Sequence, residues 1–167
     1  MSPSWTKRYS LAPERMAGIA IGRNRICAVV LGEQGGQHEA PLIRTQEIAV
    51  PLFAAPPTAE TEAMLAHALQ AASGEFRGLF AAVHVALPDT LIRSAVFELD
   101  ELPKSADMRA TLLSWRFAKE WQRAEDSLEC RGFDLGADGG KRLLFGQAGD
   151  RAWLDCVRRA LAQAGIT

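Results

Sequence analysis

The stretch VHVALPDTLIRSAVFELDELP, residues 83–103, determines how the rest of the chain is divided. It holds two short apolar runs, 83–87 and 91–99, which are separated by Pro88 and Asp89. Short apolar runs bounded by proline are typical of strands rather than helices. Proline has no N–H to donate to a sheet, so we expect the first strand to end before Pro88. This stretch is predicted to be the junction of two units, each with its own strands and helix.

Residues 17–89 show the pattern of three strands, a helix and a fourth strand. Apolar runs bounded by turns predict the strands at 17–22, 26–32, 42–52 and 83–87. Thr58 is a good N-cap for a helix that ends at Gly74. A strand that follows a helical crossover is usually parallel to its neighbour. The resulting βββαβ order is that of the opening of a ribonuclease-H-like α/β fold.

Residues 90–167 predict a second, βαββα unit, and residues 1–16 a flexible arm. The expected elements are strands at 91–99, 127–135 and 142–147 and helices at 106–122 and 150–164. Ser105 is the expected N-cap of the first of these helices, and Asp150 that of the second. The apolar phase changes between Cys130 and Phe133, so Gly132 is expected to mark a bulge.

The helix 106–122 is apolar on two sides. One side carries Met108, Leu112 and Trp115, and the nearly opposite side carries Leu113, Phe117 and Trp121. Such a helix has to be covered twice. Its own sheet covers one side, and the first unit or a partner covers the other.

Composition excludes several classes of protein. The 167 residues are 48% hydrophobic and carry a formal net charge of −1, which is typical of a globular chain and argues against a dedicated nucleic-acid binder. The three cysteines form no CxxC pair and are expected to be buried thiols. No apolar run reaches the ~20 residues that span a bilayer, and the N-terminus lacks the apolar core of a signal peptide. We therefore expect a cytoplasmic protein with no direct membrane insertion.

Several segments match one known family in order and spacing. They are GIAIG at 18–22 with the strand 26–31, VALPD at 85–89, FELDELP at 97–103, the helix around 112–119 and the helix 153–165 followed by Ile166. Together they resemble the PilM family of actin-like proteins, whose relatives include MshI and the cytoplasmic part of the type II secretion protein GspL. The resemblance covers roughly residues 17–167. It implies that residues 17–89 correspond to actin-like subdomain 1A and residues 90–167 to an inserted subdomain 1C.

The resemblance also implies a first phosphate loop at Gly22, Arg23 and Asn24. In the family an Asp of the first strand helps to hold Mg²⁺, which prefers carboxylate oxygen. The matching residue here is Ala20, so the resemblance implies no ATPase activity and leaves Mg-ATP only to a longer form that supplies the rest of the nucleotide cleft. The residues themselves favour an ordinary hairpin turn at this position.

A partner is the other implication of the resemblance. PilM-like proteins offer a channel between 1A and 1C to the cytoplasmic N-terminus of the membrane protein PilN, and the candidate residues here are Leu112, Trp115, Arg116 and Lys119. The hypothesis is a non-catalytic scaffold of a type IV pilus or type II secretion platform, held at the inner membrane through that partner. Two alternatives stay open. One is an ATPase half without its second lobe, and the other is a self-associating subunit whose second helix face is buried between copies.

Overall fold

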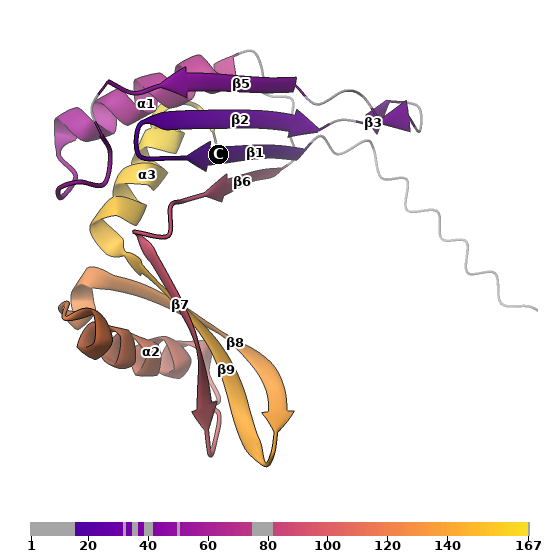
Figure 1. Ribbon diagram of the computed structural model, residues 1–167, viewed down its shortest axis with the longest axis vertical. Coiled ribbons are helices and arrows are strands. Elements are labelled where there is room, and N and C mark those ends of the chain that lie inside the picture. The colour runs from indigo at the N-terminus through magenta and orange to yellow at the C-terminus, as the bar shows by residue number, and fades with distance from the viewer. Residues whose placement is uncertain are drawn as a thin grey trace, which may run out of the picture.

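A computed structural model describes residues 16–31, 33–34, 37–38, 42–49, 51–74 and 82–166. These residues form two main sheets with helices packed against them, which confirms the predicted α/β class (Figure 1). The predicted arm falls outside the described residues except for Met16, which begins the first strand. Gly35 and Gly36, which separate the strands predicted at 26–32 and 42–52, also lie outside them.

The first sheet has the strand order β5-β2-β1-β6. Its strands are β1 (Met16–Ile21), β2 (Arg25–Leu31), β5 (Leu42–Glu47) and β6 (Ala82–Ala86), and β3 (Glu33–Gln34) and β4 (Gln37–His38) form a small separate pair. β1 is antiparallel to β2 and parallel to β6. The parallel orientation predicted for the strand after the helix is therefore confirmed.

β5 ends earlier than predicted, at Glu47 rather than near residue 52. The Ile48 N–H donates to the Asn24 carbonyl at 2.8 Å, and the Leu52 N–H donates to the Arg23 carbonyl. Ile48 and Leu52 are both buried. The segment after β5 thus leaves the sheet and crosses the tip of the β1–β2 hairpin, where burial of two apolar side chains replaces further strand pairing.

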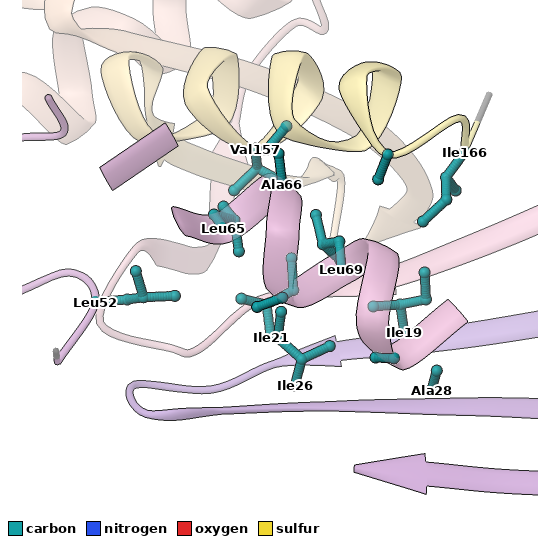
Figure 2. Packing of buried hydrophobic residues seen from close by; sticks show 14 of the residues in the cluster. Ile19, Ile21, Ile26, Ala28, Leu52, Leu65, Ala66, Leu69, Val157 and Ile166 are labelled. Atoms are coloured by element: carbon teal, nitrogen blue, oxygen red, sulfur yellow. The ribbon is translucent and has the colours of Figure 1, made fainter. Parts of the chain in front are cut away.

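Two helices share the core of the first sheet. α1 (Ala59–Ser73) is capped as predicted by Thr58, whose Oγ1 accepts from the Thr61 N–H at 3.2 Å. α3 (Arg151–Gln163) is capped by Asp150, which accepts from the Trp153 N–H at 3.2 Å. Figure 2 shows side chains of both helices and of the strands converging in one cluster. Its members include Ile19, Ile21, Ile26, Leu52, Leu65, Leu69, Trp153, Val157, Ala160 and Ile166.

The prediction that α3 packs within the second unit is wrong. Its buried stripe lies in the core of the first sheet, against α1. The reason lies in the preceding strand, because Gly149 pairs with Ile92 and the Asp150 N–H donates to the Leu91 carbonyl at 3.2 Å. The chain is thereby returned to the point at which it left the first sheet. The first unit comprises the first sheet with α1 and α3, and the second unit the second sheet with α2.

The second sheet is antiparallel, in the order β7-β9-β8. Its strands are β7 (Ile92–Leu99), β8 (Leu128–Asp138) and β9 (Lys141–Asp150), and α2 (Ala106–Trp121) and the short 3-10 helix η2 (Glu125–Ser127) lie between β7 and β8 in the chain. The predicted cap is present, since Ser105 Oγ accepts from the Met108 N–H at 3.1 Å. One face of α2 packs against the sheet and buries Leu113 and Phe117 completely or nearly so.

A socket of two glycines receives Leu113. Gly132 of β8 and Gly146 of β9 are register partners. An added Cβ would lie 2.8 Å from Leu113 Cδ1 at Gly132 and 2.5 Å from Leu113 Cδ2 at Gly146. The predicted bulge at Gly132 is therefore wrong, because this residue pairs regularly and lacks a side chain to admit the helix. The irregularity in β8 falls between Asp134 and Gly136.

Candidate functional site

The predicted phosphate loop is a tight hairpin turn whose backbone groups are largely occupied. The Gly22 N–H donates to the Arg25 carbonyl at 2.7 Å, and the Arg23 and Asn24 carbonyls accept from the segment after β5. The Gly22 N–H is thus committed to the turn and is not free for a phosphate oxygen. The side chains of Arg23 and Asn24 are exposed. Nucleotide binding at this loop stays a prediction.

Ala20 lies on the face of the first sheet that points away from α1. Its neighbours Ile19 and Ile21 are buried in the core, and alternate residues of a strand point to opposite faces. Gly18 and Cys27 border Ala20 on the same face. This side of the sheet therefore offers small and apolar groups where a magnesium site would need carboxylate oxygens.

The second apolar side of α2 is exposed. Met108 is 59% and Trp115 52% exposed. Lys119 also lies at the surface, with its Nζ 5.8 Å from the centre of the Trp115 ring. Arg116 is half-buried and lies over Phe97, 5.0 Å from the ring centre. Leu112 packs against the apolar core between α2 and the second sheet. Of the four predicted partner residues, the structure presents two outward and holds two against the sheet.

A cleft lies at the junction of the two units, and none of these four residues lines it. Its cavity volume is about 550 Å³. Four parts of the chain form its walls: the loop 53–57, the two residues before β7, the end of α2 with η2, and the first turn of α3. The lining residues include Phe53, Pro56, Pro57, Leu91, Trp121, Arg123, Asp126, Arg151, Ala152 and Trp153.

Three aromatic residues, Phe53, Trp121 and Trp153, line the cleft. Phe53 has a positive φ of 66°, a conformation that costs a residue with a Cβ about 1–2 kcal/mol. Its ring meets Trp153 edge-on, with 4.6 Å between ring centres. Arg123 lies over the Trp121 ring at 5.8 Å. The strained backbone of Phe53 is thus offset by ring packing at the base of the cleft.

The charged groups of the cleft are mostly paired inside the chain. Arg123 Nη2 lies 3.4 Å from Asp150 Oδ2, and Arg151 donates to the Leu128 carbonyl at 2.9 Å. Asp155 accepts from Arg158 at 2.9 Å. Asp126 is exposed and has no hydrogen bond or ion pair within the described residues. The cleft therefore offers an apolar, aromatic surface with one available carboxylate at its rim.

Shifted pKa values mark ion pairs and buried thiols away from this cleft. A hydrogen bond from Arg158 lowers the pKa of Glu129, and one from Lys141 lowers the pKa of Asp100. Burial raises the pKa of the Cys130 and Cys156 thiols. These are the shifts of structural pairs and of a packed interior. Across residues 16–166, wherever the structure describes them, no three His, Cys, Asp or Glu side chains could hold a metal ion, and no helix is long and apolar enough to cross a membrane.

Part of the cleft was missed from sequence because distant loops form it. Trp121 is predicted as an apolar residue of the helix 106–122, Trp153 lies in the helix predicted at 150–164, and Pro56 and Pro57 lie between the strand predicted at 42–52 and the Thr58 cap. Nothing in a single sequence indicates that these segments meet. The sequence feature that came nearest to the cleft was the second apolar side of the helix 106–122. It pointed to α2, but to the side that carries Met108 and Trp115 rather than to Trp121 at the end of the helix.

No protein-family model matches this chain, and no curated protein matches it. Among solved structures, it is similar to the PilM-PilN type IV pilus biogenesis complex, with 16% identity and a TM-score of 0.65 over 91% of this chain and 45% of that chain. It is also similar to the cytoplasmic domain of EpsL, an inner membrane component of the type II secretion system of Vibrio cholerae, with 13% identity and a TM-score of 0.58 over 91% of this chain and 54% of that chain. The chain spans about half the length of these solved chains. The expected likeness in fold to PilM and to the cytoplasmic part of type II secretion proteins is confirmed.

Proposed function

We propose that this chain belongs to the inner-membrane assembly platform of a type IV pilus or type II secretion system, where it binds the cytoplasmic N-terminal tail of a PilN-like membrane protein. It acts there as a non-catalytic scaffold on the cytoplasmic side and reaches the membrane through that partner. The cleft between the two units carries the proposal. The likeness in fold to a PilM-PilN complex supports the choice of partner.

The size of the cleft suits a peptide better than a folded domain. Ligand pockets are typically about 300–1,000 Å³, and the volume of about 550 Å³ lies within that range. An extended tail placing one or two apolar side chains against Phe53 and Trp121, which are both partly exposed, would bury aromatic surface that is otherwise wetted. Because the aromatic side chains of the cleft are already in place, binding of the apolar side chains of the tail needs no large rearrangement of the scaffold.

The available charge at the rim specifies the rest of the tail. Cytoplasmic segments beside membrane spans are enriched in Lys and Arg. Asp126 is exposed and unpaired within the described residues, so it is positioned to accept from such a side chain. The expected ligand is therefore a short peptide with apolar anchors followed by a basic residue.

The test is titration of the chain with a synthetic peptide of the cytoplasmic N-terminus of the PilN-like protein from the same genome, followed by calorimetry. Ala152 is exposed and lines the cleft, so Ala152→Trp is expected to fill it and abolish binding without disturbing the core. Asp126→Lys is expected to weaken binding of a basic tail. No binding by the unaltered chain would refute the proposal.

A matched variant separates the cleft from the outer side of α2. Trp115→Ala removes an exposed ring that does not line the cleft. We expect this variant to bind the tail as the unaltered chain does. If Trp115→Ala abolished binding and Ala152→Trp did not, the partner site would be the one predicted from the sequence, on α2.

A further inference from the structure

The face of the second sheet opposite α2 carries an exposed apolar patch. Leu144 and Gly146 of β9 face α2, so the alternate residues Leu143 and Phe145 face away from it. In the register of the sheet, Val96 and Phe133 flank Phe145 and complete a row across all three strands. The outer patch is defined as Val96, Phe133, Leu143 and Phe145.

This outer patch is not covered by the described part of the chain. Val96 is 54% and Phe133 52% exposed, and the Phe133 and Phe145 rings lie 6.3 Å apart. Figure 1 shows α2 on one side of the sheet. On the other side α3 meets the end of the sheet nearest the first unit, where Leu154 lies against Gly149 and Arg158 pairs with Glu129, and the outer patch lies beyond this contact. A contiguous apolar surface on a sheet marks an interaction site more often than scattered apolar residues do.

Two charges of opposite sign flank the outer patch at diagonal corners. Glu98 lies on β7 two residues after Val96, and Arg131 lies on β8 two residues before Phe133. β7 and β8 both run antiparallel to β9, so these positions are at opposite ends of the patch. Arg131 has a loose contact of 3.7 Å with Glu129, whose carboxylate is already bound by Arg158 at 2.7 Å. Glu98 has no ion pair within the described residues.

We propose that the outer patch is an interface between two copies of this chain, related by a two-fold axis, with the two sheets crossing at about a right angle. Sheets pack face to face either nearly aligned or at about 90°. The two-fold axis lies in the plane between the two sheets. It runs along the diagonal of the face that joins Ser94 to the irregularity after Asp134, the two corners not taken by Glu98 and Arg131. Glu98 of each copy then meets Arg131 of the other. Phe145 then faces its own counterpart, and Phe133 faces Leu143 of the other copy.

Charge complementarity favours a second copy and this crossing over the other arrangements. An aligned packing would place Glu98 against Ser94 or against the irregular part of β8. The other right-angle crossing would place Glu98 against Glu98 and Arg131 against Arg131. Only the proposed crossing forms two equivalent ion pairs, as an isologous interface requires.

The small size of a three-stranded sheet sets the strength of this association. Interfaces that bury less than about 1,000 Å² in total are usually transient. The dimer is therefore weak and concentration-dependent. It uses neither the cleft nor the outer side of α2, so it does not depend on the proposed tail binding.

The experiment is analytical ultracentrifugation of the chain from micromolar to millimolar concentration. The expected result is a monomer–dimer equilibrium that Phe133→Asp abolishes, with the fold of the variant checked by circular dichroism. Met108→Asp, on the exposed side of α2, is the control and is expected to leave the equilibrium unchanged. A monomer at every concentration would overturn the proposal, as would a dimer that Met108→Asp removes and Phe133→Asp does not.

Charge reversal tests the crossing itself. Glu98→Arg and Arg131→Glu are each expected to weaken self-association about tenfold, because each loses two ion pairs and gains two like-charge contacts. An equimolar mixture of the two variants is expected to restore association, since both pairs then have opposite signs. No recovery in the mixture would overturn the proposed arrangement of the two sheets.

Discussion

Replacing Gly146 by alanine is expected to destabilise the second unit, although alanine normally suits a strand better than glycine. A Cβ at this position would lie 2.5 Å from Leu113 Cδ2 and 3.0 Å from Phe97 Cε2. Carbon atoms in contact are normally about 3.5–4.0 Å apart, so Leu113 would have to move by about 1 Å. It has no room to turn away, because its other methyl group already lies against Gly132 and the residue is fully buried.

Two opposing contributions set the magnitude. Adding a methyl group to a well-packed core typically costs about 1–3 kcal/mol. Removing the conformational freedom of a strand glycine returns about 0.5–1 kcal/mol. The net expectation for Gly146→Ala is a loss of about 1–2 kcal/mol in the free energy of unfolding.

The assay is urea unfolding followed by circular dichroism, with Gly18→Ala as the matched control. Gly18 also lies within a strand, but a Cβ there would meet nothing within 4 Å. Gly18→Ala is therefore expected to keep or raise the stability of the chain, by up to about 1 kcal/mol. Leu113→Ala provides a second check, because a smaller side chain at 113 vacates the space and reduces the cost of Gly146→Ala.

Two results would refute this reasoning. One is a Gly146→Ala chain as stable as Gly18→Ala. The other is a penalty for Gly146→Ala that is the same with leucine or alanine at position 113. Either would show that Leu113 is not confined by the glycine pair.

Three further predictions concern single side chains. Ser105→Ala is expected to lower the free energy of unfolding by about 1 kcal/mol, because the Ser105 side chain accepts a hydrogen bond from the first turn of α2. Ser105→Asp is expected to keep the stability, because an aspartate side chain accepts the same bond. Urea midpoints measure both variants, and equal midpoints for the two would contradict the cap. Arg158 lowers the pKa of Glu129, so the pair stabilises the fold above the ordinary pKa of the carboxyl, and this stability is lost as the pH falls through the lowered value. Arg158→Ala is expected to flatten the dependence of the urea midpoint on acidic pH, and an unchanged acid profile would count against the pair. In the native chain a thiol reagent is expected to label Cys27 first, because Cys27 is partly exposed. Burial protects the other two cysteines and raises the pKa of their thiols. Mass spectrometry should show that Cys27→Ser removes the fast reaction, and equal labelling of all three cysteines would contradict the prediction.

Local signals predicted the individual elements of this fold well. Thr58, Ser105 and Asp150 each cap the helix that was expected to follow, because a side-chain acceptor before an apolar periodic segment acts within one turn. The parallel pairing of β6 with β1 followed from the rule that a strand after a helical crossover is usually parallel to its neighbour. Interactions over a few residues and general rules of connection were sufficient at these positions.

Predictions failed where the outcome depended on long-range packing. The buried stripe of α3 showed that the helix is half-buried but not which core receives it. Gly132 was interpreted as a bulge, although a strand glycine equally marks the close approach of another element, here Leu113. The cleft combines Phe53, Trp121 and Trp153 from three distant segments, and no local pattern brings them together.

The two strands that join the units enter and leave side by side, because Ile92 pairs with Gly149 and Asp150 bonds to Leu91. In evolutionary terms this is the geometry of a cassette. An insertion whose ends are neighbours can be gained, exchanged or lost in one genetic event without displacing the elements of its host, and the loop needed to close the gap is short. The glycine socket and the outer patch would travel with such a cassette, whereas α1, α3 and the first sheet would remain.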